Sequence, residues 1–224
     1  MFGKKKNRTA VVIGLGEFGL HLALSLSKCG CDCIVADIDA GKIDSIKNFV
    51  MKAIIADASQ KNALYQIVPA DADFVIIALG DIESSITAAL YLKDMKIENV
   101  YVKAISEEHE SILKMMEVKN IIFPEKDMGQ RFATKLMSNN LLDFLPLSED
   151  YSVAELAPLS SMANKSLKEI DFRKEHNLSI IAIKELVPPN MVISPSAGFK
   201  IKISDILIVL GKKDAIEAYN QKTH

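Results

Sequence analysis

A glycine-rich turn lies between an expected strand and an expected helix near the start of the chain. Residues 9–13 (TAVVI) form a short β-branched run, GLGEFG follows at residues 14–19, and apolar residues then recur at helical spacing up to residue 28. In a β-α-β unit, these glycines allow a tight turn, close approach of a pyrophosphate and close packing of the helix on the strand. The amides at the helix start then face the phosphates. The motif predicts an adenine nucleotide site on a Rossmann-type sheet.

Strands and helices alternate along the first half of the chain. Further strands are predicted at residues 33–36, 53–56, 74–79, 100–103 and 120–123, with helices between them at 18–28, 42–48, 61–67, 82–95 and 107–116. The run FVIIAL at residues 74–79 is entirely apolar, which is typical of a strand covered on both faces. The alternation predicts an α/β fold with a doubly wound parallel sheet of about six strands.

The pattern changes in the second half. A helix is predicted at residues 128–140, and a small α+β unit follows, with strands at 152–156, 179–186, 191–193 and 205–210 and a helix at 167–176. We therefore expect a nucleotide-binding domain over residues 1–124, a helix and linker over 125–147 and a second domain over 148–224. Within this scheme, residues 146–150 are the expected linker.

Composition and charge exclude several classes of protein. Hydrophobic residues make up 49% and charged residues 25%, and the net charge is -2, so the chain is neither disordered nor strongly attractive to nucleic acid or an anionic membrane. No apolar run reaches the roughly 18–20 residues that span a bilayer, and the basic N-terminus leads into a strand rather than a signal-peptide core. We expect a soluble, cytoplasmic protein with no nucleic-acid partner.

The cysteines are closely spaced, as Cys29, Cys31 and Cys33. An odd number packed this closely is not a disulfide framework, and no second pair or histidine cluster follows at metal-ligand spacing. We expect three small buried hydrophobic side chains.

Polar residues follow several of the expected strands. Asp37 lies eighteen residues after Gly19 at the end of the second strand, where a carboxylate binds ribose hydroxyls and repels a 2′-phosphate. Asp57 follows the third strand and can bond an adenine amino group, or it can form a helix N-cap shared with Ser59. Lys103 ends the fifth strand and either reaches phosphates or is solvated surface.

Catalytic residues are scarce. No histidine is paired with a plausible nucleophile, and no proton donor can be placed beside a nicotinamide. The sequence therefore favours a nucleotide-binding sensor or regulator. An NAD-dependent oxidoreductase and an NAD(H)-sensing redox regulator remain the alternatives. A DNA-binding regulator needs a basic reading helix, whereas Lys4, Lys5 and Lys6 with Arg8 form a basic tail.

Several segments together resemble a known family. They are VIGLGEFG at 12–19, ADID at 36–39, ADAS at 56–59, YVKA at 101–104 and, most specifically, IFPEKDMG at 122–129. The first part resembles the RCK domain of KtrA/TrkA-type potassium-uptake regulators, and the KtrA branch is the most similar. The second part, with YSVAEL at 151–156, IAIK at 181–184 and IVLG at 208–211, resembles the C-terminal RCK_C domain.

The resemblance implies a non-enzymatic, cytoplasmic gating subunit. Such subunits form dimers that assemble into an octameric ring beneath a membrane potassium transporter of the KtrB/TrkH type. ATP favours the conducting state and ADP the inactive one. The helix at residues 128–140 would be the crossover that exchanges between protomers.

The resemblance also assigns ligand-binding residues. The nucleotide site would comprise Gly14, Gly16, Glu17, Phe18, Gly19, Asp37, Asp57, Ala58, Leu79, Gly80, Lys103 and Glu125. The glycines and Lys103 would bind phosphates, Asp37 the ribose and Asp57 the adenine. Glu125 would hold a divalent cation, Mg²⁺ or Ca²⁺, near the γ-phosphate, because a carboxylate beside a triphosphate needs a cation between them.

One residue departs from the family pattern. KtrA proteins commonly carry Arg after the second glycine, where this chain has Glu17. An anion in that place should weaken ATP binding relative to ADP, or increase its dependence on a divalent cation.

Cyclic di-AMP is the effector that the resemblance implies for the second domain. Arg173, Ile181 and Pro195 would bind it between two protomers. The alternative is an ordinary surface arginine over a hydrophobic dimer contact.

Overall fold

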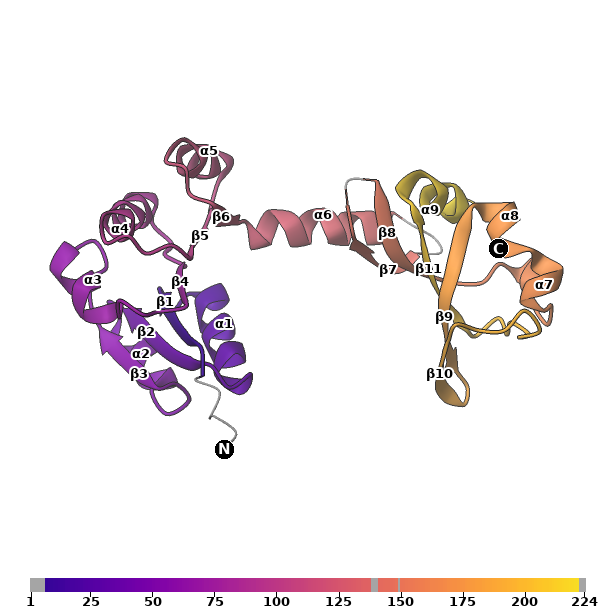
Figure 1. The fold of residues 1–224 in the computed structure, drawn as a ribbon, viewed down its shortest axis with the longest axis horizontal. Coiled ribbons are helices and arrows are strands. Elements are labelled where there is room, and N and C mark those ends of the chain that lie inside the picture. Colours follow the sequence, from indigo (N-terminus) through magenta and orange to yellow (C-terminus); the bar gives the residue numbers. More distant parts are fainter. Residues whose placement is uncertain (1–6, 138–140, 149, 222–224) are drawn as a thin grey trace, which may run out of the picture. The chain divides into compact units, whose positions relative to one another are not determined.

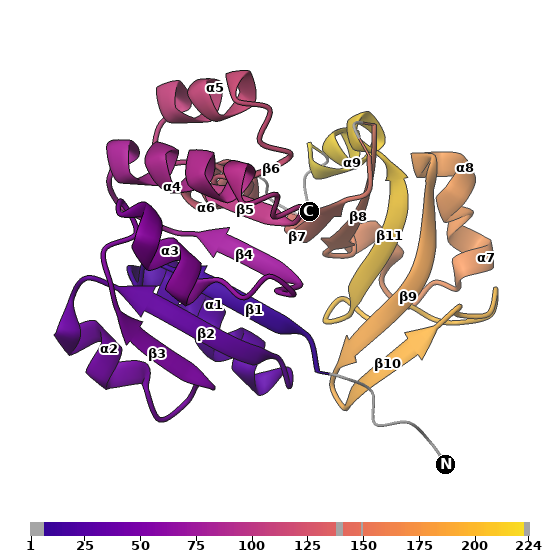
Figure 2. The ribbon, with the colours of Figure 1, turned by 60° about the vertical axis from the view of Figure 1, so that its left-hand side comes forward.

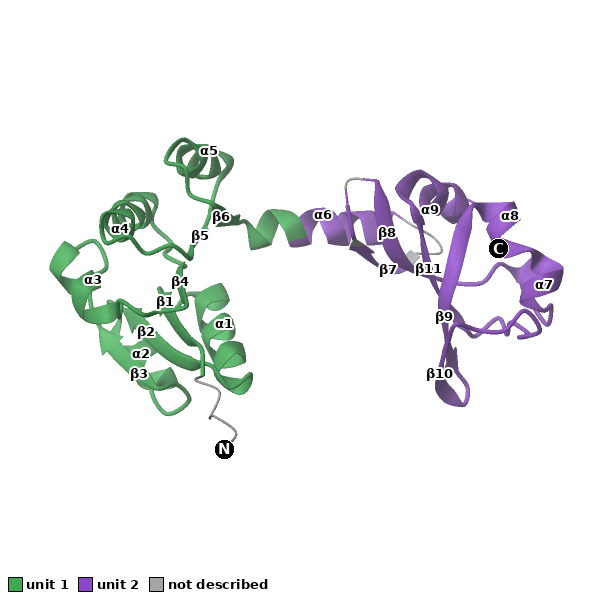
Figure 3. Ribbon diagram, in the orientation of Figure 1, with its two compact units in different colours: residues 1–127 green, residues 128–224 purple. Residues whose placement is uncertain are grey.

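The structure, a computed structural model, describes residues 7–137, 141–148 and 150–221 (Figure 1). The chain divides into two compact units, Met1–Asp127 and Met128–His224 (Figure 3). Each unit has its own sheet and hydrophobic core. The basic residues Lys4, Lys5 and Lys6 lie outside the described residues. Among the described helices, none combines the length and apolar content needed to cross a membrane.

The first unit contains a six-stranded parallel sheet in the order β3-β2-β1-β4-β5-β6 (Figure 2). Its strands are β1 (Thr9–Ile13), β2 (Asp32–Asp37), β3 (Lys52–Ile55), β4 (Phe74–Ile77), β5 (Val100–Lys103) and β6 (Asn120–Ile122). Ile13 of β1 pairs with Ala36 on one side and Ile77 on the other, so the carboxyl ends of the central strands share one edge. The predicted doubly wound parallel sheet is confirmed.

Helices cover both faces of this sheet. They are α1 (Glu17–Lys28), α2 (Ala40–Ile46), α3 (Lys61–Ile67), α4 (Ile82–Asp94) and α5 (Glu107–Met115). Val11 and Ile13 of β1 lie in one core cluster with buried side chains of α3, α4 and α5. Ala10 and Val12 lie in the other, with side chains of α1 and α2. Because alternate side chains of β1 are buried on opposite faces, the strand is apolar from Ala10 to Ile13.

Helix α6 (Pro124–Leu136) starts four residues earlier than the predicted helix. Proline is favoured at a first helical position because its missing N–H is not needed there. The expected end of this helix, at residues 138–140, lies outside the described residues. In the part that is described, no α6 residue is buried, and Met128, Phe132 and Leu136 expose apolar side chains at a spacing of four.

The second unit contains a five-stranded antiparallel sheet in the order β10-β9-β11-β8-β7. Its strands are β7 (Leu141–Pro146), β8 (Tyr151–Leu156), β9 (Leu178–Leu186), β10 (Pro189–Ile193) and β11 (Ile206–Lys212). A core of side chains from β8, β9 and β11 packs against Phe172 and Tyr219. The Tyr219 hydroxyl donates to the carbonyl of Ala157 at 3.0 Å, which ties the last helix to the chain after β8. The predicted small α+β unit is confirmed.

Three features of the second unit differ from the prediction. Residues 141–146, expected within a linker, form the edge strand β7, whose Phe144 pairs with Ala154 of β8. The helix expected at 167–176 is two short helices, α7 (Leu167–Ile170) and α8 (Phe172–His176), because Asp171 between them is left-handed with φ 45°. Helix α9 (Lys213–Asn220) was not predicted, nor was the single 3-10 turn at Ser160–Met162. The assignment of residues 125–147 is therefore wrong for β7, and the rest of the three-part division stays a prediction.

The cysteines are free thiols in three different environments. Cys29 is exposed, Cys31 is half-buried and Cys33 is buried in β2. Burial raises the pKa of the Cys33 thiol to about 11, so this side chain is neutral at physiological pH. The expectation of three buried hydrophobic side chains is therefore right for Cys33 and wrong for Cys29.

Candidate functional site

The glycine turn after β1 depends on two close contacts. Gly14 has φ +94°, and a Cβ added to it would lie 2.7 Å from the carbonyl oxygen of Ala78. A Cβ on Gly19 would overlap the carbonyl oxygen of Gly14. Only glycine fits at these positions, because α1 packs directly against the ends of β1 and β4.

The first turn of α1 faces open space. Its N-cap, Gly16, offers no side chain to the helix amides, whereas Asp39, Asp81 and Ser106 cap α2, α4 and α5. A Cβ on Gly16 would meet nothing within 4 Å. The amides at the start of α1 are therefore open to an external acceptor, and their orientation suits phosphate oxygens.

Asp37 joins the end of β2 to the glycine turn. Its side chain is 7% exposed, its Oδ2 accepts from the amide of Leu15 at 2.6 Å, and its Oδ1 accepts from the amide of Asp39 at 2.8 Å. The Lys42 ammonium lies 3.5 Å from Oδ2. Oδ1 accepts a single hydrogen bond, so it has a lone pair left for a ribose hydroxyl, whereas Oδ2 accepts from both Leu15 and Lys42.

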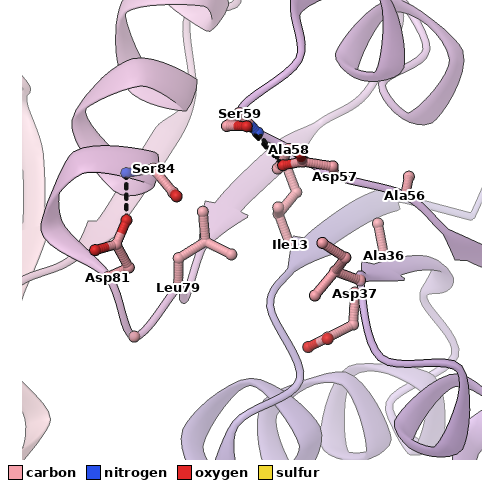
Figure 4. A pocket seen from close by; sticks show the side chains of 12 residues that line it. Ile13, Ala36, Asp37, Ala56, Asp57, Ala58, Ser59, Leu79, Asp81 and Ser84 are labelled. Carbon is pink, nitrogen blue, oxygen red and sulfur yellow. Dashed lines mark hydrogen bonds between the residues drawn. The ribbon is translucent and has the colours of Figure 1, made fainter.

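A cavity of about 180 Å³ lies beside this turn, where the ends of β1, β2, β3 and β4 converge (Figure 4). Its lining residues are Ile13, Ala36, Asp37, Ile38, Ala56, Asp57, Ala58, Ser59, Leu79, Gly80, Asp81 and Ser84. Among the residues that the structure describes, the lining includes three carboxylates and no lysine or arginine. Apolar walls with hydrogen-bond acceptors suit a base and its ribose. The negative charges of the carboxylates repel a phosphate group.

Two of these carboxylates hold local turns. Asp57 Oδ1 accepts from the Ser59 amide at 2.9 Å and from its hydroxyl at 2.7 Å, and these bonds lower the pKa of Asp57. Gln60, not Asp57, is the N-cap of α3, so the expected N-cap alternative is wrong. Asp81 caps α4 by accepting from the Ser84 amide at 2.7 Å, which lowers its pKa too. Both carboxylates are therefore ionised at neutral pH.

Phe18, Lys103 and Glu125 lie together at the other side of the glycine turn. The Lys103 ammonium is 2.5 Å from Glu125 Oε1 and 5.9 Å from the centre of the Phe18 ring. Its side chain is only 15% exposed, so Lys103 is not solvated surface. The hydrogen bond from Lys103 lowers the pKa of the Glu125 carboxyl group, which is therefore ionised at neutral pH. Glu17 is in the same helical turn as Phe18, its side chain is exposed, and its Oε2 lies 3.8 Å from Nε2 of His21.

The predicted nucleotide residues thus fall into two groups joined by the glycine turn. Asp37, Asp57, Ala58, Leu79 and Gly80 line the cavity. The second group consists of Phe18, Lys103 and Glu125. Among the described residues, no three His, Cys, Asp or Glu side chains form a metal-binding group. Glu125 would therefore supply one ligand to a divalent cation at this place, and the other ligands would come from phosphate oxygens, water or a second protomer.

Sequence reasoning missed part of the cavity lining. Ile38, exposed beside Asp37, forms an apolar wall, and Ser84 orients Asp81. Ser59, expected only as a partner of Asp57 in a helix N-cap, orients Asp57 in a turn instead. The Asp81-x-x-Ser84 spacing is a recognisable N-cap signal and could have identified one of these contacts.

The three predicted effector residues are less compactly arranged. Ile181 is on β9, and the amide of Ser194 donates to its carbonyl at 2.9 Å, which places Pro195 beside it. Arg173 is exposed on α8. Across the described part of the second unit, no hydrogen bond or ion pair joins Arg173 to either residue.

Two family models match the chain. The TrkA-N domain matches residues 10–124 and the TrkA-C domain matches residues 152–222. These matches correspond to the parallel and antiparallel sheets.

Curated relatives match nearly the whole chain. Ktr system potassium uptake protein C of Bacillus subtilis (strain 168) is 34% identical over 212 residues, covering 94% of this chain and 95% of that protein. Ktr system potassium uptake protein A of the same organism is 32% identical over 221 residues, covering 98% and 99%. Among solved structures, the GsuK channel bound to NAD has a TM-score of 0.67 at 14% identity, covering 100% of this chain and 41% of that one. That likeness shows the fold alone.

Proposed function

The chain belongs to the family of Ktr-type potassium uptake proteins with TrkA-N and TrkA-C domains, and on this premise we propose that it is a nucleotide-controlled regulatory subunit of a potassium transporter. One observation carries the proposal. The open N-terminus of α1 adjoins a cavity lined by three carboxylates, so the amides proposed for phosphate lie next to the cavity proposed for adenosine. An adenine nucleotide has the matching charge distribution.

The ligand we propose is ATP or ADP, with NAD(H) as the alternative. The GsuK structure is described as bound to NAD, so a fold of this kind accepts that dinucleotide in another protein. All three ligands share the adenosine that the cavity suits. A 2′-phosphate would meet Asp37, so NADP is disfavoured.

The site is better suited to sensing than to catalysis. Its titratable side chains, Asp37, Asp57 and Asp81, each accept hydrogen bonds from backbone amides, in their own turns and, for Asp37, also in the glycine turn. A general acid or base needs freedom to reach a reacting atom. Binding can still regulate, because a ligand shifts a conformational equilibrium by its difference in affinity for the two states.

Regulation requires assembly and a membrane partner. We propose that the chain is cytoplasmic, forms dimers that build an octameric ring, and docks on a KtrB/TrkH-like potassium transporter. The apolar stripe of Met128, Phe132 and Leu136 on α6 supports an exchange of this helix between protomers.

Calorimetric titration of the purified chain tests the proposed ligand. We expect ATP and ADP to bind, with ATP binding tightened by Mg²⁺, because Glu17 and Glu125 are the carboxylates near the phosphate end. In EDTA, we expect ATP to bind no more tightly than ADP, and tighter ATP binding there would contradict the role given to Glu17. Tight NADH binding with little response to ATP would favour a redox-linked regulator. If none of the three binds, the proposed function fails.

The effector site in the second unit remains a prediction that cyclic di-AMP binds at Arg173, Ile181 and Pro195. Arg173 is exposed, and it forms no ion pair with another described residue. Its guanidinium group is therefore available to bind a phosphate. We expect Arg173→Ala to weaken cyclic di-AMP binding about tenfold, as measured by calorimetry. Lys174→Ala, on the adjacent exposed position, is the matched control. Equal affinity in the Arg173 variant and the wild type would remove this site.

A further inference from the structure

Lys103 is already paired with an anion of its own chain. Its ammonium lies 2.5 Å from Glu125 Oε1, at the carboxyl end of β5 and beside the Phe18 ring in the first turn of α1. The lysine is therefore close to the helix amides that would receive phosphates. It lies there as half of an ion pair, and it adds no net charge to this end of the site.

The surrounding charges increase the effect of that pairing. Glu17 is in the first turn of α1, so its exposed carboxylate adds a negative charge to the end of the helix that carries those amides. Glu125 is 60% exposed, so its carboxylate can leave Lys103 without crossing a buried interior. A nucleotide without a metal ion meets open amides, an ion pair that must be broken and a nearby carboxylate.

We propose that Glu125 is a specificity-determining residue that withholds Lys103 from the phosphates of a metal-free nucleotide. This inference rests on the proposed function, because it describes how the same nucleotide site selects its ligand. Glu125 leaves Lys103 when a divalent cation accompanies the nucleotide, and Lys103 then binds a phosphate. One carboxylate thus opposes the bare nucleotide and favours the metal-bound one.

Neutralising Glu125 separates this role from that of a simple cation ligand. If Glu125 only held a cation, Glu125→Gln would weaken nucleotide binding in Mg²⁺, and in EDTA it would relieve no more than the repulsion by one carboxylate, to the same extent with or without Lys103. If it also withholds Lys103, the same variant binds nucleotide more tightly in EDTA, because the lysine is free. The two roles predict different results in EDTA.

The experiment is calorimetric titration of the full chain with ADP and with ATP in EDTA, repeated in Mg²⁺. We expect Glu125→Gln to bind both nucleotides about fivefold more tightly in EDTA than the wild type does. Glu107→Gln is the matched control, because Glu107 pairs with Lys126 at 3.2 Å and its loss changes the net charge equally. This control should stay within about twofold of the wild type.

A second substitution identifies the source of the gain. In a Lys103→Met background, Glu125→Gln should tighten binding in EDTA less than it does when Lys103 is present, since no lysine is released and only the repulsion by one carboxylate is lost. Equal or weaker binding by Glu125→Gln in EDTA overturns the inference, and so does a gain that is equally large without Lys103. If the wild type binds no adenine nucleotide even in Mg²⁺, the proposed function fails, and the inference fails with it. Circular dichroism of each variant confirms that the fold is retained.

Discussion

Replacing Gly19 by alanine should abolish nucleotide binding and lower the free energy of unfolding by about 3 kcal/mol. The new Cβ would overlap the carbonyl oxygen of Gly14 and lie 3.3 Å from the Cβ of Ala78. The atoms nearest to this Cβ belong to the backbone of Gly14, so the overlap cannot be relieved by moving a flexible side chain. Helix α1 must therefore shift from β1 and β4, and its first amides shift with it.

Urea denaturation followed by circular dichroism measures the stability, and calorimetry with ATP in Mg²⁺ measures binding. Gly16→Ala is the matched control, because its Cβ meets nothing within 4 Å. We expect this variant to unfold near the wild-type urea concentration while binding nucleotide more weakly, since its methyl group faces the phosphate approach. A Gly19 variant as stable as the wild type would show that α1 can move without cost.

Replacing Asp37 by alanine should produce the other large effect, on binding and on the turn together. The amides of Leu15 and Asp39 would lose the carboxylate that accepts their hydrogen bonds. The bond from the Leu15 amide is buried, so water cannot replace the lost acceptor there. We expect a loss of about 3 kcal/mol in the free energy of unfolding and a loss of nucleotide affinity of at least about tenfold. Calorimetry and urea denaturation measure the two losses.

The neighbouring carboxylate supplies the control for Asp37. Asp39 caps α2 by accepting from the amide of Gly41 at 2.7 Å, and it does not line the cavity. Asp39→Ala should cost about 1 kcal/mol and leave nucleotide affinity within about twofold. The ribose assignment would be contradicted if Asp37→Ala bound nucleotide as the wild type does.

The first unit could be predicted well because each of its elements carries a local signal. Residues 74–77 are apolar at every position, which requires cover on both faces, and helices on both faces provide it. Gly14 and Gly19 are needed for contacts between neighbouring elements, and their spacing is visible in the sequence. Asp37 could be located because the end of β2 is set by the same pattern.

The second unit was harder to predict because long-range pairing decides its elements. The strand β7 ends in a proline, which reads as a break, yet an edge strand tolerates proline because one side of it needs no partner. The division of α7 from α8 depends on the left-handed backbone conformation of Asp171. Residues other than glycine seldom adopt this conformation, so the sequence does not indicate it. Helix α9 is stabilised by burying Ile216 and Tyr219 against the sheet.

The candidate site shows the same limit. Sequence position placed Lys103, and the family resemblance placed Glu125, near an expected phosphate site, but neither could show that the two side chains bond to each other. Their pairing depends on the direction in which β5 ends and α6 begins, and on the rotamers of two long side chains. Likewise, the carboxylate of Asp57 is held by Ser59 through a turn of its own rather than by a helix cap.

Asp37 holds the glycine turn and is also the ribose ligand that we propose, and this combination restricts how the site can evolve. In related dinucleotide folds, ligand preference changes when an acidic residue at the end of β2 is replaced. Here the same carboxylate is the acceptor for the Leu15 amide, so its replacement also costs stability. A lineage with little stability to spare could not pass through that single substitution. It would first need another acceptor for the turn, and ligand preference is therefore protected by the fold itself.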